Sequence, residues 1–158
     1  VVPGGVGATL SRLLTPSGLF AECKLRIAGG LPGFGTCAGM ILLAAEVLDG
    51  RADQSGFGAI DIAVRRNGYG RQIDSFETDL DVSGIPGIGE TGPFHAGFIR
   101  APMVVSAGPG VEVLARHHDV AAPARPGGGA VASFHPAPTH ALGFELGFLR
   151  LNLVQTQN

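Results

Sequence analysis

Apolar and polar positions follow two different periods along this chain. In the first fifty residues apolar side chains recur at helical spacing, interrupted by one short apolar run. Between Phe76 and Val82, every second residue is instead acidic, and the residues between them are Phe76, Thr78, Leu80 and Val82, which predicts a strand with one solvent-facing side. The early pattern predicts helices at about 8–14, 19–28 and 38–48, and a strand at about 32–36.

Shorter apolar runs and a leucine repeat organise the rest of the chain. Strands are expected at about 58–65, 94–99, 111–115 and 129–134, and a closing helix at about 139–153. Glycine and proline clusters at 84–93 and 106–110 predict loops. The early order of strand, turn and helix is typical of a parallel sheet covered by helices. We expect one domain over residues 1–158.

Composition narrows the class of protein. Of 158 residues, 45% are hydrophobic and 15% charged, with a formal net charge of −2, as in ordinary globular domains. The eleven Lys and Arg residues are scattered, which argues against nucleic acid as a partner. We see no apolar run long enough for a membrane span and no signal peptide. A cytoplasmic location is therefore expected.

Cys37 stands between two glycines, in Gly35-Thr36-Cys37-Ala38-Gly39, directly after the short strand and before a helical pattern. This arrangement is typical of a nucleophile elbow, where small flanking residues allow a sharp strand-to-helix turn. A thiol at a helix N-terminus is expected to have a lowered pKa, with nearby backbone N–H groups that hold an oxyanion. The pattern predicts a catalytic cysteine.

Other cysteines and histidines support no metal site. Cys23 lies in a predicted helix and is interpreted as a small buried hydrophobic residue, so no disulfide is expected. A thiol nucleophile needs a base, and His135 is the best candidate because it follows a predicted strand. The histidines judged less suitable are His95, His117, His118 and His140.

Several segments, in this order, resemble the class I (triad) glutamine amidotransferases, specifically the glutaminase subunit of pyridoxal phosphate synthase (the PdxT/SNO family). The resemblance covers almost the whole chain, and two of its segments are narrower than the elbow: Arg-Asn-Gly-Tyr-Gly-Arg-Gln and Phe-Ile-Arg-Ala-Pro. The matching segments are 2–5, 35–44, 66–72, 74–77, 97–102, 111–115 and 133–136.

The resemblance implies a three-layer, flavodoxin-like α/β fold with a mostly parallel central sheet, helices on both faces and an added antiparallel portion. It implies hydrolysis of L-glutamine to glutamate and ammonia, without a cofactor. The ammonia would pass to a partner synthase subunit built on a (β/α)8 barrel, which makes pyridoxal phosphate.

Site residues carry over from the family by position. Cys37 takes the role of nucleophile and His135 that of base, and the backbone N–H groups of Gly5 and Ala38 frame the oxyanion hole. A buried arginine could bind the substrate carboxylate through two hydrogen bonds, although a structural salt bridge is the alternative for Arg100. The positions that match glutamine-binding residues are Gly4, Gly5, Arg66, Ile99 and Arg100.

Three departures from the family pattern fall at or near the site. The family's triad glutamate position is Ala137, which cannot accept a hydrogen bond from the imidazole. The family's Gly-Gly-Glu-Ser reads Gly4-Gly5-Val6-Gly7, and about forty residues that open the family sequence, with its first strand, have no counterpart here. Pro123 and Pro126 stand where the family has a regular strand, so that strand is expected at an edge or broken.

Three functions remain open at this point. The first is a glutaminase subunit that is active when its synthase partner is bound. The second, suggested by Ala137 and Val6, is a pseudoenzyme or regulatory subunit that keeps the docking surface without turnover. The third is a cysteine hydrolase or glutaminase of another class I branch, which would leave the motif from Arg66 to Gln72 unexplained.

Overall fold

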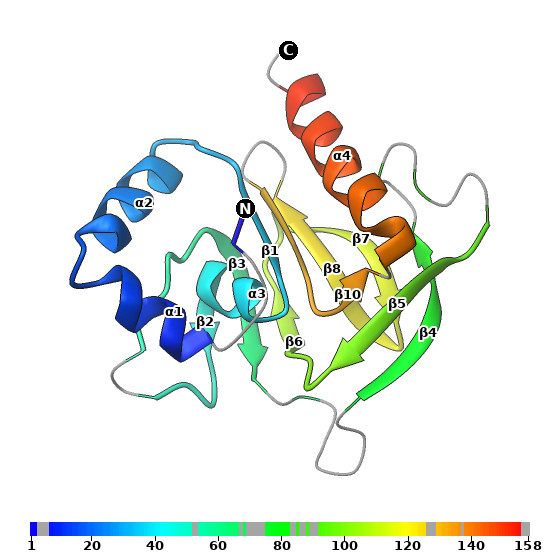
Figure 1. Ribbon diagram of the computed structural model, residues 1–158, viewed down its shortest axis with the longest axis horizontal. Helices are drawn as coiled ribbons and strands as arrows, with labels where there is room; N and C mark the ends of the chain where they lie inside the picture. The colour runs from blue at the N-terminus through cyan, green and yellow to red at the C-terminus, as the bar shows by residue number, and fades with distance from the viewer. Residues whose placement is uncertain are drawn as a thin grey trace.

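The computed structural model describes residues 1–2, 7–51, 54–66, 68, 75–82, 85, 88, 92–125, 129–136 and 138–155. In these ranges the chain forms a seven-stranded and a three-stranded sheet, flanked by helices (Figure 1). None of the helices in these ranges has the length and apolar character needed to cross a bilayer.

The helices agree with the sequence pattern, except at the end of the third. Helices α1 (Gly7–Leu14) and α2 (Leu19–Ala28) lie beside the smaller sheet, and α4 (Pro138–Gln155) lies over the larger one (Figure 1). Helix α2 ends at Gly29, whose backbone N–H donates to the carbonyl of Leu25. The three helices expected near these positions are confirmed.

The two sheets are mixed. The larger has the order β1-β9-β8-β7-β4-β5-β10 and the smaller the order β2-β3-β6. The pairs β1–β9 and β2–β3 are parallel and the other strand pairs are antiparallel. The α/β class is confirmed, and antiparallel pairing takes a larger share than a mostly parallel sheet would have. The strands are β1 (Gly33–Thr36), β2 (Ala44–Val47), β3 (Ile60–Arg65), β4 (Ser75–Val82), β5 (Phe94–Ile99), β6 (Met103–Ala107), β7 (Glu112–His117), β8 (Asp119–Arg125), β9 (Gly129–Ala132) and β10 (His135–Pro136).

The helix expected over 38–48 is half as long as predicted. Helix α3 covers Ala38–Leu43, and the chain then becomes the extended strand β2. The backbone N–H groups of Phe57 and Ala59 donate to the carbonyls of Leu42 and Leu43 at the end of α3. Parallel pairing of β2 with β3 therefore outweighs the helical preference of residues 44–48.

Strand β6 is an addition to the predicted pattern, and β8 differs in part from what was expected. A loop was expected at 106–110, but β6 extends to Ala107 and its backbone pairs with β3. The strand that carries Pro123 was expected at an edge or broken; β8 pairs with strands on both sides, so it is not at an edge. The register of β7 on β8 shifts between Val113 and Ala115, next to Pro123, so the ladder is irregular where proline has no N–H to donate.

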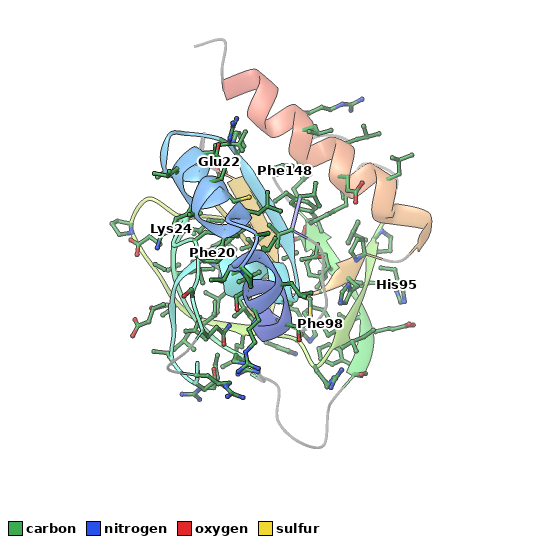
Figure 2. The ribbon with its side chains drawn as sticks, turned by 60° about the vertical axis from the view of Figure 1, so that its left-hand side comes forward. Phe20, Glu22, Lys24, His95, Phe98 and Phe148 are labelled. Atoms are coloured by element: carbon green, nitrogen blue, oxygen red, sulfur yellow. The ribbon has the colours of Figure 1, made fainter. Side chains whose placement is uncertain are left out.

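The core joins α4 to the larger sheet. Phe148 stacks on Phe34 at 4.6 Å between ring centroids, and Phe144 meets Phe94 and Phe134 at 5.3 and 5.5 Å. Phe148 of α4, labelled in Figure 2, thus packs against the larger sheet. A separate cluster under α1 and α2 includes the stack of Phe20 on Phe57. The first cluster holds β1 and β9 in place, which fixes the strand ends that carry the site.

Candidate active site

Cys37 has the backbone conformation of a nucleophile elbow. It follows β1 directly and is the N-cap of α3, with φ 50° and ψ −107°. A residue with a Cβ is strained in this region, at a cost of about 1–3 kcal/mol, and such strain gathers at functional sites. The sharp turn predicted from the two flanking glycines is present.

Both flanking glycines are required by close packing. A Cβ on Gly35 would lie 2.6 Å from the backbone carbon of Gly39, and a Cβ on Gly39 would overlap the carbonyl oxygen of Val2. The backbone of Val2 is itself hydrogen-bonded to β1, through Phe34 and Thr36. The elbow is therefore pressed against the neighbouring segment, and only glycine leaves room for it.

The thiol of Cys37 is nearly enclosed, since 9% of the residue is exposed. Its backbone N–H donates to the carbonyl of Ala132 at 2.8 Å, and its Sγ atom lies 3.9 Å from the carbonyl oxygen of Ile99. Burial raises the pKa of the Cys37 thiol; a hydrogen bond from the backbone of Ala38 and the charge of Arg100 act in the opposite direction. The expected lowering of this pKa is wrong, because desolvation is the larger effect.

His135 lies in β10, half-buried, with its backbone paired to Gly97 of β5. Burial lowers the pKa of His135 below its ordinary value, so the imidazole is neutral at pH 7 and able to accept a proton. Two contacts of Cys37 lie close in sequence to His135 and its partner: Ala132, at the end of β9, is three residues before His135, and Ile99, at the end of β5, is two residues after Gly97. The proposed nucleophile and base therefore share one end of the sheet.

The candidate glutamine-binding residues fall at strand ends. Arg66 follows β3 and is half-buried, and its backbone N–H donates to Asp49 Oδ1 at 2.7 Å. Ile99, 51% exposed, ends β5, and its carbonyl faces the thiol. Arg100 comes next, with φ 45° and an exposed side chain. Arg100 is thus not the buried arginine that was expected, and within the described ranges no salt bridge holds it.

Three predicted site positions lie outside the described residues: Gly4, Gly5 and Ala137. Their roles stay predictions. Ala38, the other residue of the predicted oxyanion hole, is buried at the start of α3, and a hydrogen bond from its backbone acts to lower the pKa of the Cys37 thiol. Its role in the oxyanion hole also stays a prediction. Among the described residues no group of three His, Cys, Asp or Glu side chains could hold a metal ion.

Sequence reasoning did not single out a cluster on the outer face of β4 and β5. His95 Nδ1 lies 2.9 Å from Asp79 Oδ1, and His95 Nε2 lies 3.2 Å from Glu77 Oε2. These contacts raise the pKa of His95 above its ordinary value. The signal was the acidic alternation along β4, but only the strand register shows that His95 stands opposite Asp79.

Comparisons with known proteins agree with this geometry. The family model described as the SNO glutamine amidotransferase family matches residues 1–146. Proteins called pyridoxal 5'-phosphate synthase subunit PdxT are similar: that of Frankia alni is 50% identical over 139 residues, covering 88% of this chain and 68% of its own. That of a Parafrankia species is 52% identical over 139 residues, covering 88% and 66%. The chain thus spans about two thirds of these relatives' length.

A solved structure supports the same comparison at the level of the fold. The crystal structure of a glutamine amidotransferase superposes with a TM-score of 0.83 and 40% sequence identity. The match covers 96% of this chain and 77% of the other. The comparison of folds and the comparison of sequences therefore both find similarity to glutamine amidotransferases.

Proposed function

Because the chain belongs to the SNO glutamine amidotransferase family, we propose that it is the glutaminase subunit of a pyridoxal 5'-phosphate synthase, hydrolysing L-glutamine to glutamate and ammonia. The observation that carries this proposal is the strained elbow at Cys37, where a thiol is held at φ 50° between two tightly packed glycines. That conformation presents the sulfur at a turn where a substrate carbon can approach.

The reaction proceeds through a thioester. The neutral imidazole of His135 takes the proton of the Cys37 thiol, and the thiolate adds to the carboxamide carbon of glutamine. Negative charge develops on the carboxamide oxygen, which the backbone N–H of Ala38, and in this proposal that of Gly5, would stabilise. The C–N bond then breaks as His135 returns its proton to the leaving ammonia. Water, deprotonated by the same imidazole, hydrolyses the thioester to glutamate.

The substrate's charged end would meet the two strand-end arginines. The α-carboxylate of glutamine suits the guanidinium of Arg100 or Arg66, since each offers two parallel N–H donors. The backbone of Ile99, with Gly4 and Gly5, would complete the glutamine site. The positive charge of Arg100 already acts on Cys37, which supports a bound substrate that reaches from one residue to the other.

Ammonia would be passed to a partner synthase subunit with a (β/α)8 barrel, because the relatives are named as subunits of that synthase. A cytoplasmic location belongs to the same proposal, and the two cysteines, both free, suit a reducing compartment. An inactive subunit of the same complex is the second candidate, favoured by Ala137 at the position of the triad acid.

Ammonia release from L-glutamine, measured with and without the synthase subunit, separates these candidates. We expect release that depends on the partner and disappears in Cys37→Ala. A chain that binds the synthase but releases no more ammonia than Cys37→Ala would be the inactive subunit. Release that is unchanged by the synthase would instead indicate a free-standing hydrolase of another class I branch.

A further inference from the structure

Helix α4 carries apolar side chains on two opposite sides. Phe144 and Phe148 are buried against the larger sheet. Leu142, Leu146 and Leu149 are instead exposed, by 68%, 45% and 51%. At about 100° per residue the three leucines lie within about 60° of one another, opposite the two phenylalanines. One side of α4 therefore holds it to the sheet, and the other presents a leucine stripe to solvent, as interaction surfaces do.

The leucine stripe lies on the outside of the molecule. Figure 1 shows α4 (Pro138–Gln155) with its C-terminal end extending beyond the sheets. Because the sheet contacts the opposite side of α4, a second helix has room to lie along the stripe. The family model matches the chain only as far as residue 146, so Leu149 and the rest of α4 lie beyond that match. The stripe is thus a feature of this chain that the family comparison does not account for.

The three leucines have the spacing of a coiled-coil seam. A step of four residues from Leu142 to Leu146, and of three from Leu146 to Leu149, places them at consecutive d, a and d positions of a heptad. Residues at these positions interlock with those of a partner helix. When the partner is a second copy in parallel, related by a two-fold axis along the helices, each leucine meets its own counterpart.

Two opposite charges flank the stripe, Glu145 at a g position and Arg150 at an e position of the same heptad. Both are exposed, and among the described residues neither has an ion-pair partner. They are five residues apart, whereas side chains that meet along one helix are three or four apart. In a parallel pair of copies, a g residue faces the e residue five positions later in the partner helix. Each Glu145 then meets an Arg150, whereas an antiparallel pair would bring like charges together.

Exposed leucines on α2 lack this arrangement. Leu19 and Leu25 are 53% and 70% exposed, but they lie about 120° apart around the helix, so they form no single stripe. Arg26, next to Leu25, already pairs with Glu22 of the same helix. The spacing and the charges therefore favour α4 as the surface that a second copy would cover.

We propose that the leucine stripe of α4 is an interface with a second copy of this chain, in which the two α4 helices pack in parallel. Leu142, Leu146 and Leu149 form the seam, and Glu145 of each copy pairs with Arg150 of the other. The seam is about two helical turns long, so the interface is small and the expected Kd is about 10–100 μM. Formation of the dimer does not depend on glutamine hydrolysis.

Sedimentation velocity of the full chain, from about 1 to 300 μM, tests the interface across the expected Kd. The mass should rise from that of one chain toward that of two. Leu146→Lys should keep the chain monomeric, because it places a charge in the centre of the seam. Leu25→Lys is the matched control: it makes the same change at an exposed leucine of α2 and should leave dimerisation unchanged. Thermal unfolding verifies that both variants fold.

Charge reversal tests the pairing across the seam. Glu145→Lys or Arg150→Glu alone should weaken the dimer by about 10-fold, since each brings like charges together. An equimolar mixture of the two variants should dimerise at least as tightly as the unmodified chain. Orientation is tested by Leu142→Cys in a Cys23→Ser, Cys37→Ala background. Parallel helices bring the two new thiols within reach of a disulfide under mild oxidation, whereas antiparallel helices hold them apart.

A mass that stays that of one chain at about 300 μM would overturn the proposal, because the expected Kd lies below this concentration. A dimer that survives Leu146→Lys, or that Leu25→Lys disrupts as strongly, would also overturn it. The same holds for single charge variants that dimerise normally, or for a Leu142→Cys variant without a disulfide between copies. A monomeric chain that loses binding to the synthase subunit in Leu146→Lys would show that the synthase covers the stripe instead.

Discussion

The Sγ atom of Cys37 lies 3.9 Å from the backbone carbonyl oxygen of Ile99. A carbonyl oxygen is an acceptor, so it favours the protonated thiol, which can donate to it, over the thiolate. This contact and the burial of the sulfur act together, and they oppose the N–H of Ala38 and the charge of Arg100. The nucleophile of the free protein is therefore held in its resting, protonated form.

This balance predicts slow alkylation of Cys37 by iodoacetamide at neutral pH. The rate should rise with pH and reach its midpoint above the ordinary pKa of a cysteine, because the thiol has a raised pKa. The measurement uses a Cys23→Ser background, so that Cys37 is the reacting thiol. A midpoint below the ordinary value would show that the elbow activates the thiol without substrate or partner.

The base should define the acid limb of the activity profile. Burial lowers the pKa of His135, so the imidazole stays neutral to lower pH than a free histidine, whose pKa is about 6.5. We expect kcat/KM for glutamine to fall on acidification with a midpoint below that value. If the midpoint lay above pH 6.5, a carboxylate would have to raise the pKa of His135 more than burial lowers it. This would apply to the enzyme that is bound to the synthase but holds no substrate.

His135 also makes the free energy of unfolding depend on pH, and acidification lowers it. The unfolded chain binds a proton at His135 near pH 6.5, whereas the folded chain binds it only at lower pH. The contribution of neutral His135 is therefore complete above pH 6.5 and is lost as the pH falls through the folded pKa. Urea unfolding of His135→Gln should show a shallower loss of stability over this interval than the unmodified chain.

Arg100 is expected to serve binding more than folding. Its side chain is exposed, so Arg100→Ala should leave the unfolding free energy unchanged within about 0.5 kcal/mol. Loss of a charge-assisted hydrogen bond to the substrate carboxylate should raise the KM for glutamine by about 10-fold or more. Arg26→Ala removes another exposed arginine, which pairs with Glu22 on α2, and serves as the control. Equal KM values for the two variants would contradict the assignment.

Local patterns predicted the elements well where a single signal dominated. The elbow at Cys37 follows from two glycines, and the alternation along β4 follows from its acidic residues. The strand at Ala44–Val47 was missed because its residues continue a helical pattern, and only pairing with β3 shows otherwise. Pairing between distant segments is a tertiary effect that local propensity does not contain.

The sequence predicted which residues form the candidate site better than it predicted their burial and their neighbours. Motif positions named Cys37 and His135, but the raised pKa of the thiol depends on burial, which no motif states. The exposed side chain of Arg100 and the contact of His95 with Asp79 depend equally on strand register. A one-residue shift in register would turn Asp79 to the opposite face, so the sequence alone could not give this relationship.

The glycines of the elbow provide a test of the fold that is independent of catalysis. Gly39→Ala places a methyl group against the carbonyl oxygen of Val2, a backbone atom that cannot rotate away. We expect a loss of about 1–3 kcal/mol in unfolding free energy, as for other overpacked positions. Gly143→Ala in α4 is the matched control, since no atom of the described residues lies within 4 Å of its Cβ position.

The control should move in the opposite direction. Alanine is favoured over glycine within a helix by about 1 kcal/mol, so Gly143→Ala should be neutral or stabilising. Urea unfolding of both variants decides the point, since the two changes add the same methyl group in different surroundings. If Gly39→Ala proved as stable as Gly143→Ala, Val2 would not pack against the elbow, and the close approach that makes glycine necessary at position 39 would be wrong.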